Sequence, residues 1–156
     1  FATRLQRGTF FQNQLVKVDV FGFGWYSPGL DRSEFDREAI EREIALASKV
    51  LLVVYGGGTT SSEMAKFSAS CAQFKNVQLH AILSTPMSWE GRKRAARATS
   101  LLEFLRSTGA TVTTVVSDQY YDQDEEDFRV SFWRVDDAML KEVQAWAATA
   151  SEVGSG

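Results

Sequence analysis

Two short stretches of this sequence combine residue types that hold phosphorylated ligands in many proteins. The first is Gly56-Gly-Gly-Thr-Thr-Ser-Ser62, in which three glycines precede four hydroxyl side chains. Glycine lets a backbone approach a ligand closely, and the free N–H groups at a following helix N-terminus attract anions. The run therefore fits a phosphate cradle. It fits a flexible turn capped by serine equally well, because it lacks the lysine of a P-loop.

The second stretch is Thr85-Pro-Met-Ser-Trp-Glu-Gly-Arg-Lys-Arg94, which holds one acid and three bases. Glu90 and Arg94 stand at helical spacing and would share one face of a helix. In a ligand site, the carboxylate would hold a ribose hydroxyl and the guanidinium a phosphate. As a surface ion pair, they would contribute only about 0.3–0.5 kcal/mol. We expect Arg92 and Lys93 to be solvated.

The composition excludes several other kinds of site. With one cysteine, Cys71, and one histidine, His80, the chain has neither an internal disulfide nor a metal cluster built on these residues. We therefore predict no metal site, a buried Cys71 and a hydrogen-bonded His80 within a strand. The net charge of −3 lacks the basic footprint of nucleic-acid binding. No apolar run approaches the roughly 18 residues of a membrane span.

Alternating strands and helices must position these stretches. Short apolar runs bounded by turn residues predict strands at 15–21, 50–55, 77–83 and 111–116. Amphipathic or small-residue segments predict helices at 33–48, 63–74, 88–107 and 132–149. This alternation implies parallel β-α-β units with right-handed crossovers. We predict one three-layer, Rossmann-like α/β domain over 15–150, preceded by a basic extension at 1–14 and followed by a tail at 151–156.

In an open parallel sheet, ligands bind beyond the carboxyl ends of the strands. Four loops are predicted at that edge: 21–29, 56–62, 84–94 and 117–127. The first resembles a dinucleotide fingerprint only weakly, because Trp25, Tyr26 and Pro28 stand where its helix-opening glycine should be. The last is acidic, and we expect it to be a solvated loop.

From residue 50 to about residue 146, the motifs resemble the GTPase domain of the FtsZ/tubulin family, on the FtsZ side. Tyr55 and the glycine run, YGGGTTSS, resemble the tubulin signature G-G-G-T-G-T-G. TPMSWEGRKR resembles K-P-F-x-F-E-G-[RK]-[RK]-R, with Trp89 in place of phenylalanine. SFWRVDDAML, at 131–140, resembles the start of the family's central helix, A-F-x-x-A-[DN]-x-x-L.

The resemblance implies GTP or GDP as the ligand and names the residues that would contact it. The phosphates would face Gly56, Gly57, Gly58 and Thr59. Glu90 and Arg94 would face the ribose and a phosphate. Phe132 would pack on guanine, and Asp136 would read its edge.

Departures from the family pattern lead us to expect a vestigial site. The signature's G-T-G is Thr60-Ser61-Ser62 here, and each added side chain crowds the backbone at the phosphate position. The guanine-loop asparagine is Ser117, and the first phosphate loop is missing or reduced to FGFGW. The family's catalytic loop would lie beyond residue 156. We therefore predict no catalytic residue, no enzyme activity and no bound cofactor.

We predict a non-catalytic, FtsZ-like pseudo-GTPase that acts through protein–protein contacts, with an FtsZ-type filament as partner in bacterial or plastid division. Aromatic residues are enriched in the cores of interfaces. The aromatic candidates in the edge loops, with Tyr55 beside them, are Trp25, Tyr26, Trp89, Tyr120 and Tyr121.

Two alternatives are open. An accessory subunit of a larger, possibly plastid, assembly would keep the fold as a packing block. Its basic segment 1–17, with Phe10 and Phe11, would reach other subunits or a membrane surface. Alternatively, a GTP-binding protein would need a partner to complete its site. The acid-free N-terminal segment and the absence of an initial methionine favour a plastid over the bacterial cytoplasm.

Overall fold

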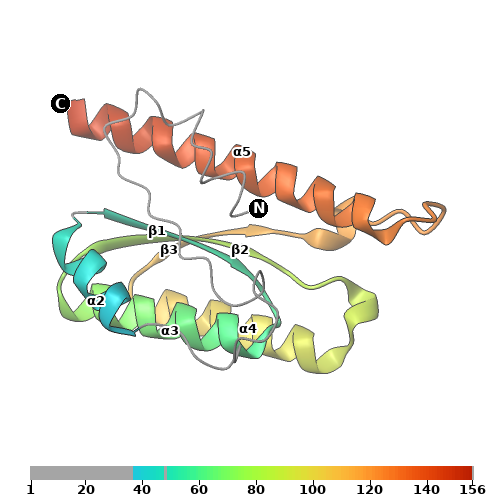
Figure 1. The fold of residues 1–156 in the computed structure, drawn as a ribbon, viewed down its shortest axis with the longest axis horizontal. Helices are drawn as coiled ribbons and strands as arrows, with labels where there is room; N and C mark the ends of the chain where they lie inside the picture. Colours follow the sequence, from blue (N-terminus) through green and yellow to red (C-terminus); the bar gives the residue numbers. More distant parts are fainter. Residues whose placement is uncertain (1–36, 48, 156) are drawn as a thin grey trace.

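The computed structural model describes residues 37–47 and 49–155 of the chain. Three strands form a parallel sheet in the order β1-β2-β3, namely β1 (Lys49–Tyr55), β2 (Gln78–Ser84) and β3 (Thr111–Val115). The α-helices are α2 (Arg37–Leu46), α3 (Thr59–Phe74), α4 (Arg92–Ser107) and α5 (Phe128–Ser155). Two 3-10 helices, η2 (Ser88–Glu90) and η3 (Ser117–Tyr120), follow β2 and β3. Helices α2, α3 and α4 cover one face of the sheet and α5 covers the other (Figure 1), so the predicted three-layer α/β architecture is confirmed here.

The strands end level with one another. Tyr55 at the end of β1 is paired with Ser84 of β2, which is paired with Val115 of β3. The segments that follow the three strands therefore meet at one edge of the sheet. We call this region the carboxyl edge: loop 56–58 with the start of α3, segment 85–91 with the start of α4, and segment 116–127 with the start of α5.

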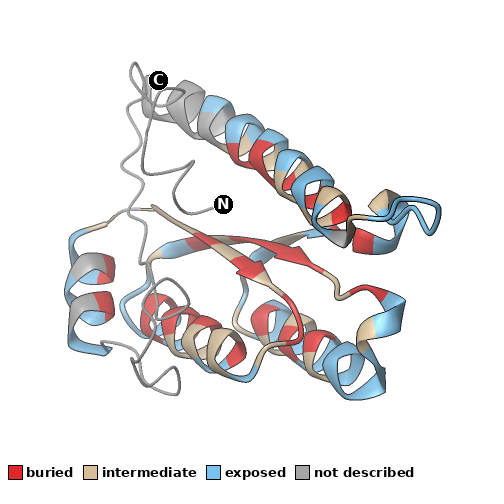
Figure 2. Ribbon diagram, turned by 45° about the vertical axis from the view of Figure 1, so that its right-hand side comes forward, coloured by how far each residue is buried: buried red, intermediate tan, exposed pale blue. Residues whose placement is uncertain are grey.

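The two faces of the sheet bury separate apolar clusters (Figure 2). Successive side chains of a strand point to opposite faces. Leu79, Ala81 and Leu83 of the central strand therefore pack with α2, α3 and α4, while Ile82 packs with α5. Burial on both faces explains why β2 reads as an almost continuous apolar run.

Several element boundaries differ from the prediction. Helix α3 begins at Thr59 rather than at 63, so the glycine loop is only three residues long. The predicted helix 88–107 is divided into η2 and α4 by Gly91, whose φ of +102° is a left-handed conformation that does not fit an α-helix. Helix α5 begins at Phe128 and runs into the segment predicted as a tail.

The predicted strand 15–21 and the predicted start of the first helix lie outside the described residues. Within the described part, no helix is both long enough and apolar enough to cross a membrane.

Candidate functional site

The glycine loop is a tight turn whose glycines are required by packing. A Cβ added to Gly56 would lie 2.5 Å from the carbonyl oxygen of Ser84. Gly57 has a φ of +104°, and a Cβ there would lie 3.0 Å from the Cβ of Arg94. A side chain at Gly56 would clash with backbone, and one at Gly57 would be strained by the positive φ and pressed against Arg94. The loop is therefore pressed between the end of β2 and the first turn of α4, whether or not a phosphate binds.

Four hydroxyl residues follow the glycines, in the first turns of α3. Ser62 is 5% exposed, so its side chain lies in the interior, away from any surface ligand. Of the two side chains that replace signature glycines, Thr60 is partly exposed and Ser62 is buried. Thr59 is exposed, and its Oγ1 accepts a hydrogen bond of 2.6 Å from Nη1 of Arg97 on α4. A cation thus lies beside the positive end of the α3 dipole.

Glu90 is bonded within its own turn. Its Oε2 accepts a 2.6 Å hydrogen bond from the backbone N–H of Met87, whose side chain is fully buried. Its Oε1 lies 3.6 Å from Nη1 of Arg94. Glu90 and Arg94 therefore do share a face, and they form the surface ion pair that was one of the two interpretations of their spacing.

Asp118 joins the segment after β2 to the segment after β3. Its Oδ1 accepts a 2.8 Å hydrogen bond from the backbone N–H of Ser88, and its Oδ2 accepts a second bond from the Ser88 hydroxyl. The bond from the Ser88 hydroxyl, and to a lesser extent the bond from its backbone N–H, holds the pKa of Asp118 below its ordinary value. The start of the predicted solvated loop 117–127 is therefore a structured link, whereas Asp122, Asp124, Glu125 and Glu126 are exposed as expected.

The two residues assigned to guanine by resemblance contact aromatic residues of the chain itself. The ring of Phe132 packs edge-to-face on Trp89, with centroids 6.0 Å apart and planes at 82°. The carboxylate of Asp136 accepts a hydrogen bond from the Tyr55 hydroxyl at the end of β1. Both contacts tie the first turns of α5 to the carboxyl edge.

The structure thus brings all eight candidate nucleotide residues to the carboxyl edge, from three different segments. Among the interface candidates, Trp89 and Tyr121 are 52% and 44% exposed, and Tyr120 is partly buried in η3. Trp25 and Tyr26 lie outside the described residues.

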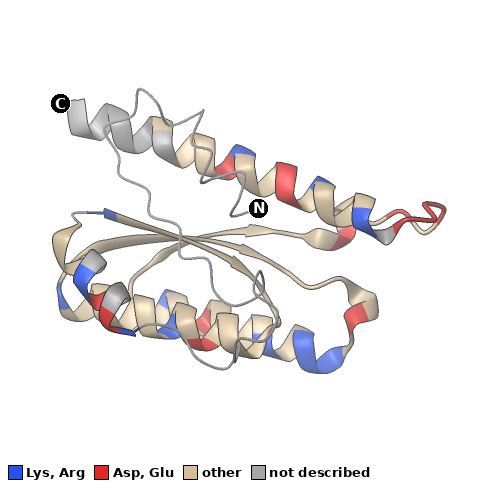
Figure 3. Ribbon diagram, viewed as in Figure 1, with Lys and Arg blue, Asp and Glu red and all other residues tan. Residues whose placement is uncertain are grey.

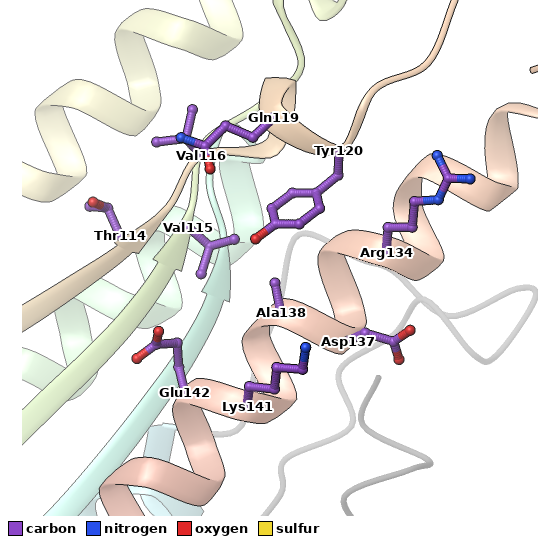
Figure 4. A pocket seen from close by; sticks show the side chains of 10 residues that line it. All are labelled: Thr114, Val115, Val116, Gln119, Tyr120, Arg134, Asp137, Ala138, Lys141 and Glu142. Carbon is purple, nitrogen blue, oxygen red and sulfur yellow. The ribbon is translucent and has the colours of Figure 1, made fainter. Parts of the chain in front are cut away.

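A groove that the sequence did not reveal lies between β3, η3 and α5 (Figure 4), with a volume of about 500 Å³. The lining residues are Thr114, Val115, Val116, Gln119, Tyr120, Arg134, Asp137, Ala138, Lys141 and Glu142. They come from three segments without any recognisable motif, and they carry both signs of charge. None of the eight candidate nucleotide residues lines it.

Cys71 and His80 have structural surroundings. Cys71 is buried, and burial raises the pKa of its thiol. The Nε2 of His80 lies 3.0 Å from Oγ1 of Thr113, so the predicted strand hydrogen bond is confirmed. In the described ranges, no three His, Cys, Asp or Glu side chains gather as metal ligands would.

The parallel sheet, its two helical layers and its polar carboxyl edge define a Rossmann-like α/β fold. Among solved structures, one FtsZ chain from M. jannaschii, a Trp-to-Tyr variant, superposes with a TM-score of 0.64 at 20% identity. The match covers 71% of this chain and 34% of that one, so the chain spans about a third of the FtsZ chain. At this identity the likeness shows the fold alone. The chain has an FtsZ/tubulin-like fold, which confirms the resemblance at that level.

Comparison of the sequence with family models gives no match, and no curated protein matches it.

Proposed function

We propose that this chain is a non-catalytic, FtsZ-like pseudo-GTPase that acts through protein–protein contacts at its carboxyl edge. The observation that carries the proposal is the internal pairing of the guanine-side residues, Phe132 with Trp89 and Asp136 with Tyr55. We infer that a guanine base would compete with both partners for these two side chains. An aromatic pair contributes about 0.5–1.5 kcal/mol and a hydrogen bond to a charged group about 1.5–3 kcal/mol. Because each 1.4 kcal/mol is tenfold in affinity, losing both contacts weakens binding on the order of a hundredfold.

The ribose side supports the same proposal. The Glu90 carboxylate already accepts a hydrogen bond from Met87 and faces Arg94. A ribose hydroxyl would compete with a bond that caps the η2 turn, and this turn positions Trp89. A bound nucleotide would therefore need the same Glu90 carboxylate that stabilises the fold of the carboxyl edge.

The proposed partner is an FtsZ-type filament, in bacterial or plastid division. The FtsZ-like fold and the exposed rings of Trp89 and Tyr121 support it. An accessory role in a larger assembly fits the same surface, and it would be favoured if the chain binds no FtsZ.

One observation favours a second candidate, a GTP-binding protein whose site a partner completes. Arg94 and Arg97 lie beside the glycine loop and the positive end of α3, where an anion would be stabilised. This side of the edge would hold phosphates if the guanine side were opened.

Calorimetric titration of the chain with GTP and GDP, alongside its melting temperature, tests the proposal. We expect no saturable heat and no thermal shift with the unaltered chain. The double variant Tyr55→Phe/Trp89→Ala removes both internal partners and should bind GTP more tightly than the unaltered chain does. Saturable binding by the unaltered chain, lost in Arg94→Ala, would overturn the proposal in favour of the second candidate.

A further inference from the structure

The exposed charges of the carboxyl edge are separated by sign (Figure 3). On the α4 side, Arg92 and Lys93 are exposed at the start of the helix. On the α5 side, four exposed carboxylates precede the helix: Asp122, Asp124, Glu125 and Glu126. The ion pairs of the described residues at this edge, Arg94 with Glu90 and Arg129 with Asp127, each stay within one segment. Neither ion pair joins the basic group to the acidic group.

Two exposed aromatic residues adjoin the charged groups in the sequence, and we call them the aromatic centre: Trp89 precedes the basic group and Tyr121 precedes the acidic group. Trp89 belongs to η2 and Tyr121 follows η3, and both rings are about half exposed. The two hydrogen bonds between Ser88 and Asp118 hold these segments together. Exposed aromatic rings on a fixed backbone lose little conformational freedom on binding, which favours their use in an interface.

We propose that the carboxyl edge docks on the same edge of a second copy of this chain, forming a two-fold symmetric dimer. The proposal rests on the proposed function, because the edge must be free of nucleotide, and the dimer would compete with an FtsZ-type filament for this edge. A two-fold axis through η2 would stack the two aromatic centres. The same axis would set the basic start of α4 against the acidic segment of the partner copy, and this contact would occur twice.

Self-complementarity is the reason for choosing a second copy as the occupant. A partner with one sign of charge would match one half of the edge and repel the other half. Since α4 and α5 lie on opposite faces of the sheet, rotation by 180° exchanges the basic and acidic halves. An isologous contact therefore pairs both halves with opposite charge at once.

Analytical ultracentrifugation of the full chain between roughly 1 and 100 µM tests this surface. We expect a dimer at low salt that dissociates as salt rises, because exposed charges are screened beyond ~10 Å at 0.1 M. Glu125→Lys/Glu126→Lys, and separately Arg92→Glu/Lys93→Glu, should each weaken dimerisation on the order of ten- to a hundredfold, since every reversal acts at two symmetric contacts.

The decisive measurement is the mixture of these two reversed variants. The mixture should form a heterodimer, because the reversed acidic segment of one variant meets the reversed helix start of the other. The control variant Glu38→Lys/Glu41→Lys reverses two acidic residues on exposed positions of α2, the same charge change as in Glu125→Lys/Glu126→Lys. It should dimerise like the unaltered chain.

A monomer under all conditions, or a dimer unaffected by both reversals, would overturn this inference. Either result leaves the proposed function standing if GTP does not bind. Saturable GTP binding would instead overturn the proposed function and, with it, the nucleotide-free edge on which the dimer depends, so calorimetry separates that failure from the first.

Discussion

The candidate residues on the two sides of the carboxyl edge differ in what they contact. On the α3 and α4 side, the backbone arrangement is present: Gly56 and Gly57 make the tight turn, and Arg94 and Arg97 lie against it. On the α5 side, Phe132 and Asp136 are present but are paired with Trp89 and Tyr55. The glycines are needed for packing alone, so they say little about a ligand. The contacts of Phe132 and Asp136 bear directly on whether a base can bind.

The largest effect should come from the glycine turn. Gly56→Ala would place a methyl group 2.5 Å from the Ser84 carbonyl oxygen, which belongs to the backbone and cannot rotate away. Overpacking of this kind should lower the free energy of unfolding by about 2–3 kcal/mol. Urea denaturation of the ligand-free chain measures it.

Gly109→Ala is the contrasting control: Gly109 has a positive φ, +86°, which Gly56 does not have, but a Cβ there would meet nothing within 4 Å. We expect a cost of about 1 kcal/mol from backbone strain alone. Equal losses in the two variants would mean that the turn is looser than the structure shows, and the glycines would again need a ligand to explain them.

The next effect concerns the link between β1 and α5. Tyr55→Phe removes the hydroxyl that donates to Asp136 and changes little else. We expect the free energy of unfolding to fall by about 1–2 kcal/mol, since the lost hydrogen bond goes to a carboxylate that is only partly buried. Tyr121→Phe removes a hydroxyl from an exposed ring and should change stability by less than about 0.5 kcal/mol. If Tyr55→Phe is equally neutral, the hydrogen bond from Tyr55 does not stabilise the link between β1 and α5.

A smaller coupling should connect Trp89 and Phe132. A double-mutant cycle with Trp89→Ala and Phe132→Ala isolates their contact from the burial of each ring. The edge-to-face geometry at 6.0 Å predicts a coupling of about 0.5–1.5 kcal/mol. A coupling near zero would mean that the two rings do not stabilise each other, and the Trp89 contact would then not oppose a bound base.

The sheet and its helical layers follow from patterns that the sequence displays directly. Strand 50–55 is apolar along its length, and 77–83 is apolar except at Gln78 and His80, because α-helical layers cover both faces of the sheet. The sequence predicts the residues at which helices begin less accurately than it predicts the strands. Beside three glycines, Thr59 and Thr60 have the composition of a loop. In the structure the helix begins at Thr59, with Gly58 as its N-cap in an extended conformation. Gly91 divides the next helix by a positive φ that no periodicity analysis detects.

The candidate site could be predicted only as a set of positions. Glu90 and Arg94 are close in sequence, so their helical spacing alone predicts that they share a face. The partners of Phe132 and Asp136 come from segments more than forty residues away, and only the register of the strands brings them together. The sequence places Asp118 in the acidic loop 117–127, because no neighbouring residue distinguishes it from the exposed carboxylates that follow.

Asp118 joins the two sides of the edge, and its titration gives the smallest predicted effect. Its pKa is lowered in the folded chain, so its bonds to Ser88 stabilise the fold above the ordinary pKa of 3.8. That contribution is lost as the pH falls from 3.8 through the lower folded value. Ser88→Ala removes the side-chain bond and should move the pKa of Asp118 back toward 3.8, as measured by NMR titration of its carboxyl carbon. Fluorescence of Trp89 should report the loosening of η2 in the same pH range. If the pKa of Asp118 is unchanged in Ser88→Ala, the hydrogen bond between Ser88 and Asp118 does not hold the two sides of the edge together. The docking surface proposed above depends on this link and would then have to be abandoned.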